Sequence, residues 1–260
     1  MLNNATLSQL RDMGLPAMAS CFKEQSELRS AEKSGTAPLS FEERFGLLVE
    51  AERLSRRNNR INRLIKQAGC GLTVRRFPSV LEDIDYSGKH GITKPEVLKL
   101  SLGNYIKKAQ NIFISGPTGV GKTYLACALG RAACAQGVQV VYSRVSDFFR
   151  NIPTPTPHFR KISFRDKCAQ TSLLIFDDWG LKKFSPEETH ELSDLFERRY
   201  GRASTIISGQ VPFTSWHDLF PDPTQADSIL DRLVHNAYIY NISGESMRKT
   251  IGKRSLESKD

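Results

Sequence analysis

Residues 116–123 decide the fold, and they read Gly116-Pro117-Thr118-Gly119-Val120-Gly121-Lys122-Thr123. An apolar run, residues 112–114, precedes them, and a helix-prone segment, residues 124–129, follows. Strand, glycine-rich turn and helix form the setting in which the pattern G-x-x-x-x-G-K-[ST] binds nucleotide phosphates. The glycines let successive backbone N–H groups curl around the phosphates, and the helix start adds the positive end of its dipole. The sequence therefore predicts a phosphate-binding loop in which Lys122 contacts the β- and γ-phosphates of ATP and the Thr123 hydroxyl binds Mg²⁺.

A pair of acids ends a second strongly apolar run. Residues 173–176 read Leu-Leu-Ile-Phe, and Asp177 and Asp178 follow directly. In the same α/β unit as a phosphate loop, such a strand end is typical of a Walker B element. We expect Asp177 to hold Mg²⁺ through water, because Mg²⁺ keeps much of its hydration shell. We expect Asp178 to orient and deprotonate the attacking water.

Strand and helix patterns alternate through the rest of the chain. Predicted strands cover residues 112–114, 138–142, 173–176 and 205–208, and Ser185-Pro186 begins a helix with an N-cap and a proline at its first position. This alternation predicts an α/β fold, a mostly parallel sheet with helices on both faces. At the end of the last of these strands, either Ser208 or Gln210 could contact the γ-phosphate or the attacking water.

The N-terminal part has helical patterns only. Thr6 is a candidate cap for a helix that stops at Gly14, Pro16 suits the first turn of the next, and Ser40 with Glu43 forms a capping-box pattern for a third. We therefore divide the chain into a small all-α domain for DNA or a partner (residues 1–68), a connector (69–110) and a nucleotide-binding domain (111–260).

The third helix has two different faces. An apolar stripe recurs at spacings of three and four residues: Leu47, Ala51, Leu54, Asn58, Ile61 and Ile65, with only Asn58 polar. Five arginines lie on the other face: Arg53, Arg56, Arg57, Arg60 and Arg63. Between Arg53 and Arg76 there are eight basic residues and no acidic one, so this face repels itself. DNA phosphate would complete it, since guanidinium groups suit phosphate; a merely solubilising face is the alternative.

Composition narrows the class of protein. The 260 residues carry a net charge of +9, which favours a polyanionic partner. There is no apolar run long enough for a membrane span, and the N-terminus lacks a signal-peptide pattern. The five cysteines are scattered without a C-x-x-C pair, which favours reduced, buried thiols in a cytoplasmic protein over a disulfide framework or a zinc site.

Taken together, these motifs resemble a family, the AAA+ ATPases that include DnaC-type helicase loaders and IstB-type transposition helpers of insertion sequences. The resemblance rests on residues 116–123, 174–181, 210–212, 216–219 and 229–248. It implies Walker A roles for Lys122 and Thr123 and Walker B roles for Asp177 and Asp178. It further implies sensor roles for Gln210 and Arg248, and in Arg232 an arginine finger that acts on a neighbouring subunit.

The resemblance also implies partners. They are duplex DNA, a transposase, and further copies of the chain in a homo-oligomer with ATP sites at the subunit interfaces. Segments such as Asp177-Asp178-Trp179-Gly180 and Trp216-His217 favour the IstB branch. The first alternative is a loader of a replicative helicase. A small-molecule kinase is the second, although it would have no use for a helix with five arginines.

Overall fold

The computed structural model describes residues 2–31, 39–69, 79–84, 86, 91–150 and 163–244. The chain divides into two compact units, Met1–Arg63 and Leu64–Asp260. The division falls inside one long helix, α3 (Phe41–Ala68), and residues 91–110 belong to the second unit. We call the two units the N-terminal unit and the ATPase unit.

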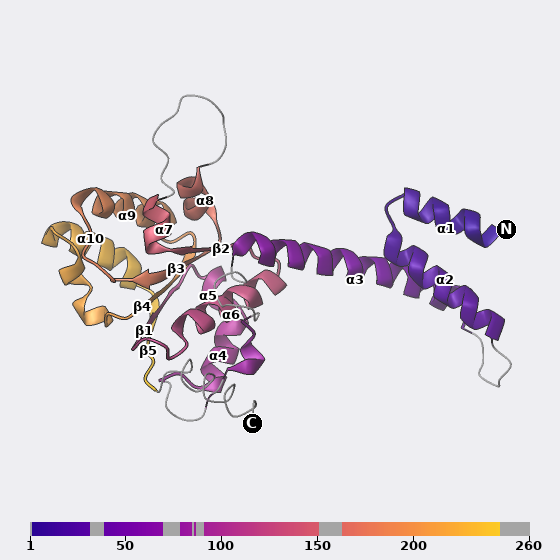
Figure 1. The fold of residues 1–260 in the computed structure, drawn as a ribbon, viewed down its shortest axis with the longest axis horizontal. Coiled ribbons are helices and arrows are strands. Elements are labelled where there is room, and N and C mark those ends of the chain that lie inside the picture. Colours follow the sequence, from indigo (N-terminus) through magenta and orange to yellow (C-terminus); the bar gives the residue numbers. More distant parts are fainter. Residues whose placement is uncertain are drawn as a thin grey trace, which may run out of the picture. The chain divides into compact units, whose positions relative to one another are not determined.

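The N-terminal unit is helical, as predicted. It holds α1 (Leu2–Asp12), α2 (Pro16–Ala31) and most of α3 (Phe41–Ala68), which then continues into the ATPase unit (Figure 1). The capping box at α3 is confirmed: Glu43 N donates to Ser40 Oγ at 3.2 Å, and Ser40 N donates to the Glu43 carboxylate at 2.8 Å. The cap predicted at Thr6 is wrong, because α1 begins at Leu2 and Thr6 lies within it.

Little of this unit is buried. Ala19 is the one fully buried apolar side chain among those described in residues 1–63. Glu52 is only 6% exposed, and its carboxylate accepts from Ala17 N at 3.0 Å and Met18 N at 3.1 Å, which fastens the start of α2 to α3. Large apolar side chains of α3 are exposed: Phe41, Phe45, Leu47, Val49 and Leu54. The predicted apolar stripe therefore exists in the sequence but is only partly covered within the unit.

The ATPase unit is built on a five-stranded sheet in the order β2-β3-β4-β1-β5. Its strands are β1 (Asn111–Ser115), β2 (Val140–Arg144), β3 (Leu173–Trp179), β4 (Ser204–Gly209) and β5 (Ala237–Asn241). Every neighbouring pair is parallel, so the predicted fold class is confirmed. The carboxyl ends of parallel strands meet at one edge, and the predicted phosphate loop and acid pair both lie there.

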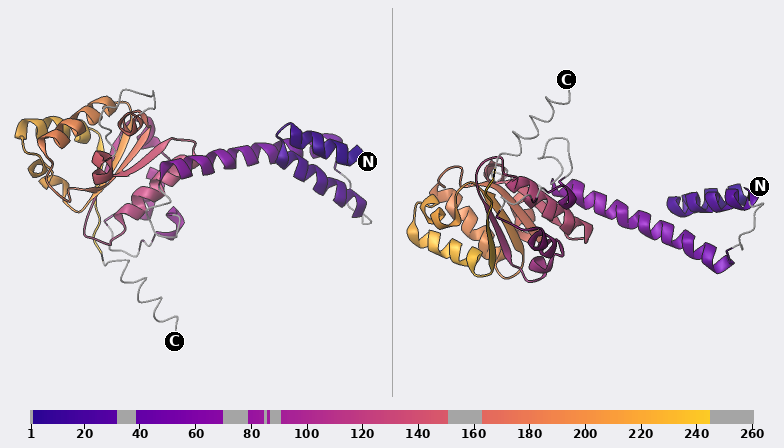
Figure 2. Two further views of the ribbon diagram at one scale, coloured as in Figure 1. Left: turned by 45° about the horizontal axis from the view of Figure 1, so that its top comes forward. Right: turned by 90° about the horizontal axis from the view of Figure 1, so that it is seen from below.

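Helices cover both faces of this sheet (Figure 2). They are α4 (Lys94–Ser101), α5 (Asn104–Lys107), α6 (Lys122–Ala135), α7 (Val145–Arg150), α8 (Phe164–Gln170), α9 (Pro186–Arg199) and α10 (Pro223–Val234), with short 3₁₀ helices η1 (Leu81–Asp83), η2 (Phe213–Ser215) and η3 (His217–Leu219). Alternate strand residues point to opposite faces. Ile112 and Ile114 thus pack in one apolar cluster with α4, α5 and α6, and Phe113 packs in a second cluster with α7 to α10.

The cysteines behave as small apolar side chains. Cys127, Cys134 and Cys168 are buried, Cys21 is partly buried, and Cys70 lies outside the described residues. Burial raises the pKa of Cys134 to about 11 and that of Cys168 to about 12. Both therefore stay protonated at neutral pH.

Helices long and apolar enough to cross a membrane do not occur among the described residues.

Candidate functional site

The loop after β1 has the backbone conformation that a phosphate cradle requires. Gly116, Gly119 and Gly121 all have positive φ values, +147°, +91° and +102°. A Cβ at Gly116 would lie 2.1 Å from the carbonyl oxygen of Ile242, so a side chain there is excluded. Helix α6 starts at Lys122 directly after the loop. Its first N–H groups therefore face the loop, where they can bind an anion.

Lys122 curls back over this loop. Its Nζ donates to the carbonyl oxygens of Gly116 at 2.8 Å and Pro117 at 2.7 Å. The ammonium group is thus held at the entrance of the cradle, where phosphate oxygens can take over from the carbonyls as its partners.

Asp177 lies at the centre of a group of hydroxyls. It is 3% exposed, and its oxygens accept from Thr123 Oγ1 at 2.8 and 3.0 Å and from the Tyr142 hydroxyl at 2.8 Å. Ser208 Oγ also donates to it. The structure thus joins the Thr123 hydroxyl to the Asp177 carboxylate, the pair that the sequence predicts for Mg²⁺. Hard oxygen donors of this kind suit Mg²⁺.

Tyr142 is a member of the site that sequence reasoning missed. Burial, together with the adjacent Asp177 carboxylate, raises the pKa of Tyr142, so the phenol stays protonated and donates. It lies near the end of β2, and the pairing of β2 with β3 places Arg144 beside Asp177. The register between β2 and β3 brings Tyr142 and Arg144 next to the acid pair, and the sequence does not specify this register.

Asp178 differs from its neighbour in exposure and in backbone. Its side chain is 38% exposed, and its φ is +60°, in the left-handed region. Arg144 Nε lies 3.4 Å from Asp178 Oδ2. A hydrogen bond to Tyr142 raises the pKa of Arg144, and the carboxylates of Asp178 and Asp177 act in the same direction. The acid pair therefore consists of one buried carboxylate held by hydroxyls and one open carboxylate beside a cation.

Of the two polar candidates at the end of β4, Ser208 makes the contact with Asp177. Ser208 is fully buried, whereas Gln210 lies beyond the strand and is exposed. The difference follows from the end of β4 at Gly209, which leaves Ser208 inside the sheet and Gln210 in the segment after it. Arg248, the predicted second sensor, lies outside the described residues.

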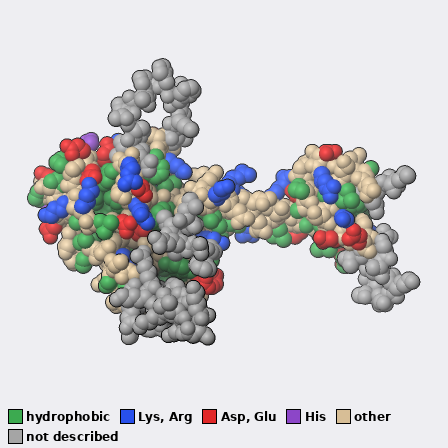
Figure 3. Space-filling model, viewed as in Figure 1, with side chains coloured by type: hydrophobic (Ala, Val, Ile, Leu, Met, Phe, Trp, Pro, Cys, Tyr) green, Lys and Arg blue, Asp and Glu red, His purple; other side chains and the backbone are tan. Residues whose placement is uncertain are grey.

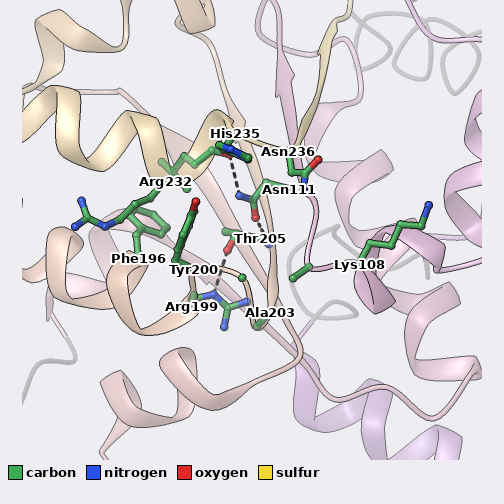
Figure 4. A pocket seen from close by; sticks show the side chains of 13 residues that line it. Lys108, Asn111, Phe196, Arg199, Tyr200, Ala203, Thr205, Arg232, His235 and Asn236 are labelled. Carbon is green, nitrogen blue, oxygen red and sulfur yellow. Dashed lines mark hydrogen bonds between the residues drawn. The ribbon is translucent and has the colours of Figure 1, made fainter.

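Arg232 lies at the other end of the sheet. It lines a cavity of about 220 Å³ together with Asn111 and Thr205, which lie at the amino ends of β1 and β4 (Figure 4). Its Nη2 lies 2.5 Å from the Glu197 carboxylate, and its Nη1 donates to Ser228 O at 2.6 Å. Strand β1 has five residues and rises by about 3.3 Å per residue, so it spans roughly 16 Å between this end of the sheet and the phosphate loop.

Asn111 ties α10 to this end of the sheet. Its Nδ2 donates to the carbonyl oxygen of Leu233, near the end of α10, at 2.8 Å. Its Oδ1 accepts from Thr205 N at 2.9 Å. Strand β1 thus connects the phosphate loop at one end with the helix that carries Arg232 at the other.

The arginines of α3 divide into two groups. Arg53 pairs with Glu50 at 2.5 Å, and Arg56 pairs with Glu52 at 2.9 Å. The prediction that this face repels itself is therefore wrong for these two, because the acids lie one turn earlier in the helix. Basic side chains also project from α3 in Figure 3. Arg57, Arg60 and Arg63 are exposed, and they have no acidic side chain within ion-pair distance in the described part of the chain.

Arg75 and Arg76, the last two of the eight basic residues counted in the sequence from Arg53 onward, lie outside the described residues.

Comparison with known proteins gives consistent matches. The model of the family described as IstB-like ATP binding protein matches residues 8–255. A protein of Sinorhizobium fredii named as an insertion sequence ATP-binding protein, y4pL, is 39% identical over 98% of this chain and 100% of its own length. One of Pseudomonas fluorescens, named as the ATP-binding protein of insertion sequence IS1162, is 34% identical over 82% of this chain and 88% of its own.

Solved structures share the fold. The DnaC helicase loader superposes with a TM-score of 0.52 at 17% identity, over 66% of this chain and 100% of its own. The replication initiator DnaA, bound to AMPPCP and single-stranded DNA, gives a TM-score of 0.52 at 25% identity, over 69% of this chain and 55% of its own. The ATPase unit therefore has the AAA+ fold.

Proposed function

This chain belongs to the family of IstB-like ATP-binding proteins and is an ATPase, and we propose that it regulates transposition by assembling on DNA with ATP and acting on a transposase. The observation that carries the proposal is the meeting of Thr123 with Asp177 beside the phosphate loop, in a chain whose relatives are named for insertion sequences.

The residues of the site have separate roles in the proposed reaction. The loop amides and Lys122 bind the phosphates of ATP. Thr123 and Asp177 would hold Mg²⁺, which when bound supplies positive charge against the phosphate oxygens. Tyr142 and Ser208 fix the orientation of the Asp177 carboxylate. Asp178 accepts the proton of the water that attacks the γ-phosphate.

Arg232 is proposed to complete the site of a neighbouring copy. It lies at the end of the sheet opposite to the phosphate loop of its own chain, so it cannot serve that loop without a large rearrangement. Transfer of a phosphoryl group spreads negative charge over the γ-oxygens, and an arginine there lowers the barrier. This role makes the active form a homo-oligomer with ATP between subunits. Arg248 is proposed to act within its own subunit, and Gln210 as the sensor beyond β4.

DNA is proposed to bind α3 through Arg57, Arg60 and Arg63, with Arg53 and Arg56 as further contacts. The first three present guanidinium groups that are not engaged by carboxylates in the described structure. Guanidinium groups bind phosphate well, and such contacts position a protein without reading bases.

Native mass spectrometry with ATP, Mg²⁺ and duplex DNA tests the assembly directly. We expect multimers of the chain on the duplex only when ATP is present. Asp178→Asn protein should bind ATP and stay assembled, because Asn cannot accept the proton and the nucleotide is not hydrolysed. An assembly that forms equally well without nucleotide would overturn the proposed role of ATP.

A mixing experiment tests Arg232. Arg232→Ala protein alone should bind ATP but not hydrolyse it. Mixed with Lys122→Ala protein, it should regain part of the activity, because one interface then joins an intact nucleotide site to an intact Arg232. Inactivity at every mixing ratio would argue against a shared site.

The transposase is tested by its own activity. Strand transfer by the partner transposase should depend on ATP and on this protein, and should not be supported by Lys122→Ala protein. If this protein instead stimulated loading of a replicative helicase and left strand transfer unchanged, the loader alternative would replace the proposal.

A further inference from the structure

Asp178 has a backbone conformation that residues other than glycine adopt infrequently. Only two described residues other than glycine have positive φ values, Ala109 at +50° and Asp178 at +60°. Such a conformation costs free energy in an L-residue, and it persists only where the surrounding structure enforces it. Something next to Asp178 must therefore hold it.

The pairing of β3 with β4 shows where this constraint acts. The register is regular up to Phe176 and Ile207, then shifts, and resumes with Trp179 opposite Gly209. Asp178 lies inside this irregularity, between two residues that are fixed in the ladder. A bulge of this kind re-aims the side chains within it, and bulges are common beside active sites.

Trp179 closes the bulge on the side that follows Asp178. Its side chain is fully buried. Its ring packs against Phe184 at 4.9 Å between centroids and against Trp216 at 5.3 Å. A buried tryptophan surrounded by aromatic rings has few alternative positions, so its backbone is fixed as well.

Gly209 closes the bulge from the side of β4. A Cβ at this position would lie 2.5 Å from the carbonyl oxygen of Trp179, so the two backbones are closer than any side chain would allow. The bulge is therefore held from two directions, by the indole of Trp179 in the core and by the missing side chain of Gly209.

We propose that Trp179 is a positioning residue for hydrolysis: its burial locks the bulge of β3 and holds Asp178 in the left-handed conformation that aims the carboxylate at the attacking water. The inference rests on the proposed role of Asp178 as the proton acceptor. It means that a buried side chain, next in sequence to Asp178, controls the rate of ATP hydrolysis.

Trp216 provides a matched control for the loss of an indole. It is 1% exposed, belongs to the same aromatic cluster and packs against Trp179 with its ring tilted by 42°, but it lies outside the bulge. Its Nε1 donates to Val211 O at 3.0 Å, so Trp216→Phe removes a hydrogen bond in addition to part of the aromatic packing. A purely structural role for Trp179 predicts the same effect from both substitutions.

Steady-state ATP hydrolysis and ATP affinity, measured on the full chain, distinguish a positioning role of Trp179 from a purely structural one. Trp179→Phe should lower kcat by about tenfold to 100-fold, since small misplacements of a reacting group have effects of this size. ATP affinity should stay within about twofold, because the phosphate loop is unchanged. Trp216→Phe should keep kcat within about twofold even if both variants unfold at a lower temperature. Equal losses of kcat, or a normal kcat in Trp179→Phe, would overturn the proposal.

Gly209→Ala provides a second perturbation with Trp179 intact. The added methyl group must displace the Trp179 carbonyl, so kcat should fall with unchanged ATP affinity. This variant decides the matter if Trp179→Phe does not fold, and a normal kcat in folded Gly209→Ala would then overturn the proposal. Asp178→Asn separates this inference from the proposed function: if it hydrolyses ATP at the normal rate, the role of Asp178 itself fails.

Discussion

The ATPase unit and the N-terminal unit differ most in how they bury apolar side chains. The ATPase unit has two clusters, one on each face of its sheet, and both contain many fully buried residues. In the N-terminal unit, Ala19 is the one fully buried apolar side chain among those described. Burial of apolar surface is the main favourable term in folding. We therefore expect the ATPase unit to be the more stable of the two, and the N-terminal unit to gain stability from what binds it.

This difference matches a division of work between the units. A nucleotide site needs side chains held within fractions of an ångström, and a rigid sheet provides that. A helical unit that recognises a long polyanion needs only a row of positive charges, and folding and binding can occur together. Extensive burial of apolar side chains is thus found where chemistry is proposed, and sparse burial where assembly is proposed.

Hydrogen exchange should show the largest contrast. Amides of β1, β3 and β4 should exchange at least about 1,000-fold more slowly than those of α1 and α2, because local stability follows buried contacts. Duplex DNA with ATP should slow exchange in α3 far more than in the sheet. Equal protection of both units in the free protein would show that the N-terminal unit is stable by itself, and would contradict the expected difference in stability between the units.

Lys122→Ala should affect the ATPase unit alone. Loss of a charge-assisted contact to phosphate should weaken ATP binding by about 100-fold. The exchange rates of α1 to α3 should not change. Fluorescent nucleotide titration measures the first effect, and an unchanged ATP affinity would show that the loop does not bind the phosphates.

Paired arginine variants test the N-terminal unit alone. Each phosphate contact on duplex DNA contributes about −0.9 to the slope of log affinity against log salt concentration. Replacing Arg57 and Arg60 by Gln should therefore flatten that slope by about one to two units, similarly on unrelated sequences. ATP affinity should be unchanged.

The matched control replaces Arg53 and Arg56. Because these side chains are paired with Glu50 and Glu52, their removal should flatten the slope less. A wild-type slope in the Arg57 and Arg60 variant would place the DNA surface elsewhere on the chain.

Tyr142→Phe should have the smallest effect. It removes one hydrogen bond to Asp177 while keeping the ring, so Mg²⁺ should tighten nucleotide binding about three- to tenfold less than in the wild type. Nucleotide affinity measured with EDTA should be the same in both proteins. If Mg²⁺ tightens binding equally in both, Tyr142 does not orient Asp177.

Local patterns predicted the parts of the site that are continuous in sequence. The phosphate loop has a fixed spacing, and the acids follow a buried strand, so both could be placed without knowledge of the fold. Tyr142, Arg144 and the contact made by Ser208 depend on the register of three strands. Single-sequence periodicity carries no information about that register, which is why they were missed or left open.

Two predictions about helices were wrong because each considered too few residues at the N-terminal side. Counting charges from Arg53 excluded Glu50 and Glu52, whose side chains reach Arg53 and Arg56 one turn later. Thr6 is a good capping residue, but α1 begins before it. The apolar stripe of α3 was recognised correctly, although periodicity cannot tell whether a face is covered by the same chain or by another.

The two ends of strand β1 lead to two different functional features of the subunit. Its carboxyl end leads into the phosphate loop, and its amino end is tied through Asn111 to the helix that carries Arg232. If Arg232 serves the next copy, every contact between neighbouring subunits joins two different surfaces. One is the end of the sheet that carries Arg232, and the other is the nucleotide site of the next copy. Such head-to-tail contacts either close into a ring or continue as an open helix. In an open row, one terminal nucleotide site lacks an arginine, so hydrolysis per subunit should rise with the length of the row.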